Sequence, residues 1–286
     1  MRRSVAIICG SLSASGGLML GAIVGDFIGS IYEKTNYRPR RPTQVHIPNL
    51  ITRENFFTDD TVLTIATADL LCNKKPGAET LREYTWNYPD AGYSEGHWLW
   101  TIDDNCPARK SEGNGAAMRI SPYAYMHWHE CGRSDEFYDG AITLANLTHN
   151  TPKAMVGAAC LARCIFSARH TNIASVVRQE AYELEMLMIP PELVRDEAIP
   201  SNRVEDTLPY ALLFALESED FEDCMRRCLW FGVDADTICC MAGALAAELH
   251  GIPQYITDHV LFMLDVKHPE LFKVFQECSL PMGIKW

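Results

Sequence analysis

Two short acidic clusters, far apart in the chain, constrain its fold more than any other feature. The clusters are Thr58-Asp59-Asp60-Thr61 and Asp234-Ala235-Asp236-Thr237, and each leads directly into an apolar segment with helical spacing. Four carboxylates are costly to bring together without cations, and their oxygens suit Mg²⁺, Mn²⁺ or Ca²⁺ better than Zn²⁺. If the fold joins the clusters, they form a two-metal site and one domain spans most of the chain. The structural alternative is a pair of helix starts capped by acidic residues, without a metal.

Composition excludes several classes of protein. The chain has 286 residues, of which 48% are hydrophobic, so it can build a sizeable core rather than remain disordered. The net charge is −12 without a basic stripe, which argues against nucleic-acid binding. No apolar run is long enough for a membrane span. The 11 cysteines form no zinc pattern, so we interpret them as buried thiols in a reducing compartment and expect a cytoplasmic protein.

Helical spacing dominates the chain, and we find neither an alternating strand pattern nor a strand–helix–strand rhythm, which predicts an all-α fold. Helices are expected in residues 62–72, 135–149, 152–169, 171–187, 205–217, 220–230 and 238–249, with one or two more in 255–276. Residues 84–112 are rich in Tyr, Trp, Gly and Pro, and we interpret them as a long aromatic loop that walls a ligand site. Residues 1–18 are interpreted as a flexible leader or an upstream start, which leaves 19–286 as a single domain.

The apolar segment 18–32 carries Gly21, Gly25 and Gly29 at a spacing of four. Glycines on one helix face allow a second helix to approach closely. Asp26 and Glu33 are two helical turns apart, so they share a face. Near metal ions, Glu33 could orient or deprotonate water, whereas the structural alternative is a solvated helix end.

Two further motifs could contact an anionic ligand. Gly113-Asn114-Gly115 precedes a helix, and glycines there allow backbone amides to approach a phosphate; the alternative is an ordinary turn. Thr148-His149 precedes another helix start, where His149 could donate to a phosphate or hydroxyl; the alternative is a structural histidine.

Together these motifs resemble the ADP-ribosylglycohydrolase family. Five stretches match in the family's order: residues 20–33, Phe57-Thr-Asp-Asp-Thr61, Gly113-Asn-Gly-Ala-Ala-Met-Arg119, Thr148-His149 with Pro152, and Asp234-Ala-Asp-Thr237. The resemblance covers residues 19–253. It implies a single-domain, orthogonally packed multi-helix bundle around two Mg²⁺ or Mn²⁺ ions.

The resemblance also implies roles for individual residues. The metal ligands would be Thr58, Asp59, Asp60, Asp234, Asp236 and Thr237. The catalytic residues would be Glu33, Asp60 and Asp236. Ser111, Gly113, Asn114, Gly115 and His149 would bind the substrate. The implied reaction is hydrolysis of the glycosidic bond between ADP-ribose and a protein side chain or small acceptor, through an oxocarbenium-like transition state. The expected partner is therefore an ADP-ribosylated protein or a small ADP-ribosyl compound.

The chain departs from the family pattern at three places. Val233 stands where the family usually has a glycine, and a β-branched residue at positive φ would be strained. Glu112 stands where an aromatic residue often stacks on adenine, and it would put an anion beside a dianionic ligand. The segment 200–206 is shorter than in close relatives. These departures keep an alternative open, in which the same fold binds ADP-ribose or a related nucleotide with little or no turnover.

Overall fold

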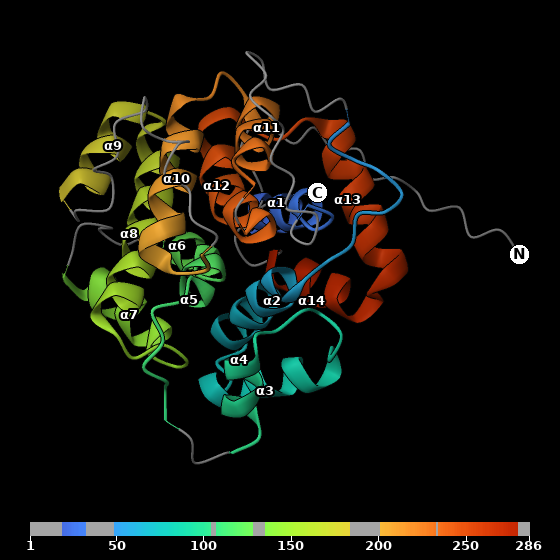
Figure 1. Ribbon diagram of the computed structural model, residues 1–286, viewed down its shortest axis with the longest axis vertical. Coiled ribbons are helices and arrows are strands. Elements are labelled where there is room, and N and C mark those ends of the chain that lie inside the picture. The colour runs from blue at the N-terminus through green and yellow to red at the C-terminus, as the bar shows by residue number, and fades with distance from the viewer. Residues whose placement is uncertain are drawn as a thin grey trace, which may run out of the picture.

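The computed structural model describes residues 19–32, 49–103, 107–127, 135–183, 201–232 and 234–279. They fold into a bundle of helices that pack in several directions (Figure 1). In chain order the helices are α1 (Leu20–Gly29), α2 (Asp59–Cys72), α3 (Gly77–Asn87), α4 (Glu95–Thr101), α5 (Gly115–Met118), α6 (Ser121–Met126), α7 (Asp135–Ala145), α8 (Pro152–Thr171), α9 (Ala174–Glu183), α10 (Val204–Glu217), α11 (Phe221–Phe231), α12 (Ala235–His250), α13 (Gln254–Lys267) and α14 (Pro269–Ser279). Extended pairing within these ranges consists of two isolated bridges, Arg109 with His149 and Gly113 with Arg203. The predicted all-α class is confirmed.

Helices α1 and α12 form the centre of the bundle, where they lie side by side (Figure 1). Every residue of α1 is buried. A methyl group on Gly25 would overlap the carbonyl oxygen of Cys239, and one on Gly21 would overlap that of Gly243. The glycines therefore allow the two backbones to touch, as their spacing predicted. Since α12 begins within the second acidic cluster, this contact brings that cluster beside α1.

Helix α2 carries the first acidic cluster at its N-terminal end and packs against α1, α3, α6 and α14. On the other side of the molecule, α8 packs against α7, α9, α10 and α12 (Figure 1). Helix α8 begins at Pro152, three residues after His149, and its packing against α12 brings that part of the chain toward the central helices. The core is continuous across all these contacts.

The aromatic segment is not the long loop that the sequence predicted. Helix α3 extends to Asn87, and α4 occupies Glu95–Thr101. Trp100 is buried with the Arg82 guanidinium 4.4 Å above its ring, and Tyr93 stacks on His97 with ring centroids 5.0 Å apart. The loop prediction was wrong because these rings pack inward and stabilise short helices, which the Gly and Pro content of the segment obscured. The segment does line the cavity described below, through Gly92, Ser94, Gly96, His97 and residues 109–112.

The eight cysteines in the described ranges are free thiols, and all except the half-buried Cys72 are buried. Among the described helices, none has both the length and the apolar character needed to cross a bilayer. Residues 1–18, Glu33 and Val233 lie outside the described residues.

Candidate functional site

Asp26, in the fully buried α1, holds the start of α2 in place. Its carboxylate accepts from the backbone N–H groups of Thr58 and Thr61, at 3.0 and 3.2 Å. It also accepts from both threonine hydroxyls, and the Thr58 bond measures 2.7 Å. The Thr58 oxygen in turn caps α2 by accepting from the backbone N–H of Asp60 at 3.2 Å. The sequence placed Asp26 on a helix face with Glu33 but did not assign it to the site. The signal that could have identified it is a charged residue inside an otherwise apolar helix.

The fold joins the two acidic clusters. Carboxylate oxygens of Asp26, Asp60 and Asp236 all lie within 4.8 Å of one another. The hydroxyl of Thr237 donates to Asp60 Oδ2 at 3.2 Å, across 177 residues of sequence. Asp60, Asp236 and Thr237 are buried. We call this group of Asp26, Asp60, Asp236 and Thr237 the acidic floor.

The acidic floor concentrates negative charge at a buried place. Burial raises the pKa of Asp60 well above its usual range, and the charges of Asp236, Asp26, Asp59 and Asp234 raise it further. Burial also raises the pKa of Asp26 to about 6, although its bonds from Thr61 and Thr58 oppose this shift. Within the described part of the chain, Asp60 Oδ1 is buried without a hydrogen-bond partner. A buried, unpaired carboxylate oxygen among other hard oxygen donors fits a divalent cation.

Asp59 and Asp234 stand beside the floor and are less buried. The backbone N–H of Asp59 donates to the carbonyl of Ala91 at 2.8 Å, which links α2 to the segment before α4. Asp234 adopts a left-handed backbone with φ of 45°, and its carboxylate accepts from the side-chain amide of Asn114. Among the described residues of this turn, Gly232 and Asp234 have positive φ, and both residue types tolerate it.

The Gly113-Asn114-Gly115 motif opens the short helix α5, as predicted, and lies close to His149. A methyl group on Gly115 would lie 3.1 Å from His149 Cε1, and one on Gly113 would lie 3.5 Å from His149 Nε2. The Ser111 hydroxyl accepts from the backbone N–H of Gly113 at 3.2 Å. The missing side chains keep the backbone of this segment accessible next to the histidine.

His149 is buried and electrically neutral at physiological pH. Burial lowers its pKa to about 3, and the nearby Arg119 and Arg109 lower it as well. Arg119 donates to the Thr148 hydroxyl at 2.9 Å, and that hydroxyl lies 2.8 Å from His149 Nδ1. Because the hydroxyl accepts from Arg119, its own hydrogen is available for Nδ1. This arrangement favours the tautomer that carries its proton on Nε2, toward Gly113.

One cavity of about 770 Å³ contains most of the predicted site residues. It is lined by Asp59, Asp60, Ser111, Gly113, Asn114, Gly115, His149, Asp234, Asp236 and Thr237. Thr58 lies behind the floor, where it caps α2. Arg109, which the sequence interpretation did not single out, also lines the cavity. The cavity is therefore acidic on one side and carries arginine, histidine and glycine on the other.

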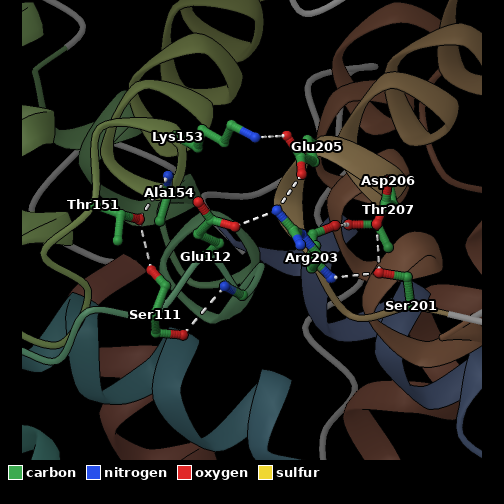
Figure 2. Close-up of polar contacts among 11 residues, drawn as sticks. Ser111, Glu112, Thr151, Lys153, Ala154, Ser201, Arg203, Glu205, Asp206 and Thr207 are labelled. Atoms are coloured by element: carbon green, nitrogen blue, oxygen red, sulfur yellow. Dashed lines mark hydrogen bonds and ion pairs between the residues drawn. The ribbon is translucent and has the colours of Figure 1, made fainter.

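An exposed network of ion pairs lies at the edge of this cavity (Figure 2). Arg203 pairs with both Glu112 and Glu205, and Glu205 also pairs with Lys153. We call these four residues the rim network. The backbone supports it, because Val204 N–H donates to Glu112 O and Asn114 N–H donates to Asn202 O, both at 2.9 Å. The charge of Glu112 is thus balanced by a cation of the protein.

Comparison with known proteins agrees with the predicted resemblance. The family model for ADP-ribosylglycohydrolase matches residues 12–274. The ADP-ribosylarginine hydrolase Tri1 of Pseudomonas putida (strain GB-1) is 24% identical over 281 residues, which covers 85% of this chain and 72% of that protein. The ADP-ribosyl-[dinitrogen reductase] glycohydrolase of Rhodospirillum rubrum is 27% identical over 155 residues, which covers 54% of this chain and 51% of that protein.

A solved structure supports the same fold. It is described as an ADP-ribosylglycohydrolase-related protein complex, and it superimposes with a TM-score of 0.66 at 22% identity. The match covers 92% of this chain and 96% of that one. With the family model spanning nearly all of the described helices, the chain belongs to the ADP-ribosylglycohydrolase family.

Proposed function

We propose that this protein hydrolyses the bond between the anomeric carbon of ADP-ribose and an acceptor group. The observation that carries the proposal is the cavity, which combines the buried acidic floor with the glycine segment and a neutral histidine. Two relatives are named for hydrolysis of ADP-ribosylarginine and of ADP-ribosylated dinitrogen reductase. An ADP-ribosylated protein side chain, with arginine tested first, is therefore the proposed substrate.

The floor and its neighbours would hold divalent cations. Asp60 and Asp236 offer buried carboxylate oxygens, and Asp59, Asp234, Thr58 and Thr237 are the further proposed ligands. Asp26 accepts four bonds from Thr58 and Thr61, so we assign it a positioning role rather than direct ligation. A pair of Mg²⁺ or Mn²⁺ ions would neutralise the carboxylates and fix the hydroxyls of the distal ribose.

In the proposed reaction, a water oxygen bonds to the anomeric carbon while the bond from that carbon to the acceptor nitrogen or oxygen breaks. The electron pair of the broken bond remains on the acceptor, which takes up a proton. Positive charge develops at the anomeric carbon in the transition state. As the proposed ligands, Asp60 and Asp236 would help to hold the ribose that carries this carbon in position for the attack of water. Glu33, four residues after the end of α1, is the proposed base for the water proton.

The opposite side of the cavity would bind the rest of the nucleotide. The Gly113 and Gly115 backbone is open to a phosphate, because neither residue has a side chain in the way. His149 would donate from Nε2 as a neutral group. Ser111 is fixed at the same wall, since its carbonyl accepts from the Thr151 hydroxyl at 2.7 Å (Figure 2).

The rim network bears on the alternative of a binding module without turnover. That alternative was motivated partly by Glu112, an anion expected near an anionic ligand. Because Arg203 pairs with Glu112, the carboxylate adds little repulsion toward an anionic ligand, which removes one of the two reasons for that alternative. Val233, the other motivation, lies outside the described residues.

The test is release of ADP-ribose from three substrates in the presence of Mg²⁺: an ADP-ribosylarginine peptide, an ADP-ribosylserine peptide and O-acetyl-ADP-ribose. Calorimetry with Mg²⁺ and with ADP-ribose provides a second readout that does not depend on turnover. Release from at least one substrate is expected. Binding of ADP-ribose without any release, at high protein concentration, would establish the binding module instead.

A further inference from the structure

Cys72 differs from the other cysteines in the described ranges because it is partly exposed. It is half-buried, whereas the others are buried. It is the last residue of α2, about 20 Å along the helix from the acidic cluster at the N-terminal end. Its thiol is therefore accessible to small solutes at a place that is separate from the cavity.

A second thiol and a thioether lie beside Cys72, where α2, α6 and α14 meet. Helix α14 packs against α2 (Figure 1), and Cys72 Sγ lies 3.8 Å from the backbone carbonyl oxygen of Cys278. The Sδ atom of Met126, the last residue of α6, lies 3.9 Å from the same Sγ. The Cys278 thiol also hydrogen-bonds to the Cys72 sulfur, so the two sulfur atoms are in direct contact.

This contact gives the two thiols different chemical characters. The hydrogen bond from Cys278 lowers the pKa of Cys72, although burial and the charge of Asp69 oppose this shift. The same bond, together with burial, raises the pKa of Cys278, so this fully buried thiol keeps its proton. The thiolate is the form that attacks an oxidant, and the accessible member of the pair forms it more readily.

We propose that Cys72 and Cys278 form a reversible oxidation site, at which a hydroperoxide converts the two thiols into a disulfide that ties α2 to α14. The Cys72 thiolate attacks a peroxide oxygen and the O–O bond breaks, which leaves a sulfenic acid on Cys72. The departing hydroxide or alkoxide takes up a proton. The Cys278 sulfur then bonds to the sulfenic sulfur, and the hydroxyl group leaves as water with the Cys278 proton. The two thiols together lose two electrons, which the peroxide gains.

Two other thiol contacts in the chain provide a comparison. Cys164 hydrogen-bonds with Cys160, and Cys224 with Cys228. The members of each pair lie four residues apart on one helix, and all four side chains are buried. Burial raises the pKa of Cys224 and Cys228 well above the usual range of a thiol. Oxidation requires both access and thiolate, so these pairs should remain reduced under conditions that oxidise Cys72.

The test treats the folded full-length protein with a modest molar excess of hydrogen peroxide. Remaining thiols are then alkylated, and the protein is digested without reduction for mass spectrometry. A Cys72 peptide linked to a Cys278 peptide is expected, and dithiothreitol should remove the link. Cys72→Ser and Cys278→Ala should each abolish it. The matched control, Cys160→Ala, removes a buried thiol and should form the link as the unaltered protein does.

Thermal unfolding provides a second readout. The link joins residues 206 positions apart, so it restricts the unfolded chain strongly. Peroxide should raise the melting temperature of the unaltered protein by about 5–10 °C and leave that of Cys72→Ser unchanged. Recovery of Cys72 as a free thiol, or its link to any other cysteine, would overturn the proposal, as would an equal thermal shift in both proteins. No ADP-ribosyl ligand takes part in this chemistry, so these outcomes leave the proposed hydrolase activity untouched.

Discussion

The two ends of helix α2 each carry a buried aspartate, and the protein treats them in opposite ways. At the C-terminal end, Asp69 pairs with Lys75 and also accepts from Asn73 and Tyr84, all at 2.7 Å. At the N-terminal end, Asp60 faces other carboxylates, and its Oδ1 has no partner within the described residues. The same helix therefore contains one carboxylate paired with a cation and one whose Oδ1 has no hydrogen-bond partner in the described part of the chain.

This difference indicates which aspartate serves structure and which serves function. Burial raises the pKa of Asp69, but its bonds from Lys75, Asn73 and Tyr84 outweigh burial and lower the pKa overall. The pKa of Asp60 is raised both by burial and by neighbouring charge. Since the protein pairs the buried carboxylate of Asp69 at one end of α2, packing alone does not require Asp60 Oδ1 at the other end to remain without a partner. A divalent cation bound at Asp60 would balance the negative charge of this carboxylate.

The largest expected effect is on activity, and it should separate the two aspartates. Asp60→Asn keeps the shape of the side chain but removes a charge from the floor, so hydrolysis should fall by at least about a hundredfold. Asp69→Asn should retain activity within a few-fold, since Asp69 does not line the cavity. Initial rates on an ADP-ribosyl peptide at saturating Mg²⁺ provide the measurement. Equal losses in the two variants would remove the distinction.

The second prediction concerns stability without metal. Here Asp69→Asn should be the more damaging variant, the reverse of the order expected for activity. Asp69→Asn loses the charge that pairs with Lys75, and this should lower the free energy of unfolding by about 1–2 kcal/mol. Asp60→Asn relieves repulsion within the floor, so its stability in chelator should equal or exceed that of the unaltered protein. Urea unfolding at pH 7 in EDTA gives both values. Added Mg²⁺ should then stabilise the unaltered protein but not Asp60→Asn.

The regularity of the helices is the part of this molecule that the sequence predicts best. The expected helices in 152–169, 205–217 and 220–230 correspond closely to α8, α10 and α11, because helical spacing is a local signal. The glycines at spacing four also predicted a close helix contact, which α1 makes with α12. What local spacing does not contain is the identity of the partner helix.

The arrangement of the site residues depends on which helices pack together, and helical spacing does not give this. Asp60 meets Thr237 because α1 and α2 both pack on α12. From the sequence alone, we could expect this contact only on the condition that the fold joins the two acidic clusters. Asp26 was placed on the helix face of Glu33 but not assigned to the site, because its importance lies in its bonds to Thr58 and Thr61, which are distant in sequence. Arg203 was likewise invisible, since its pairing with Glu112 requires the segment before α10 to lie against the glycine segment.

His97 is a buried titratable group whose charge is suppressed by burial rather than paired with an opposite charge. Burial, together with Arg119 and Arg109, lowers the pKa of His97 to about 3 in the folded protein, against an ordinary value of about 6.5. Below pH 6.5 the unfolded chain therefore binds a proton that the folded protein does not, so stability falls as the pH decreases toward 3. His97→Gln should reduce this loss by on the order of 1 kcal/mol between pH 7 and pH 5.5.

Urea midpoints at the two pH values measure that slope. The variant itself loses a side chain that lies 2.9 Å from the Thr85 hydroxyl and stacks on Tyr93, so its absolute stability should be lower at both pH values. The informative quantity is the difference between pH values. A slope identical to that of the unaltered protein would mean that His97 titrates normally in the fold.

The smallest expected effect concerns the rim network, where charges are balanced but exposed. The side chains of Arg203 and Glu112 are 45% and 38% exposed, so water screens their attraction. In a double-mutant cycle with Arg203→Ala and Glu112→Gln, the coupling free energy should be below about 1 kcal/mol and should decrease further in high salt. A coupling of several kcal/mol would mean that the rim is as tightly compensated as Asp69, and that paired carboxylates around this cavity contribute to stability regardless of their exposure.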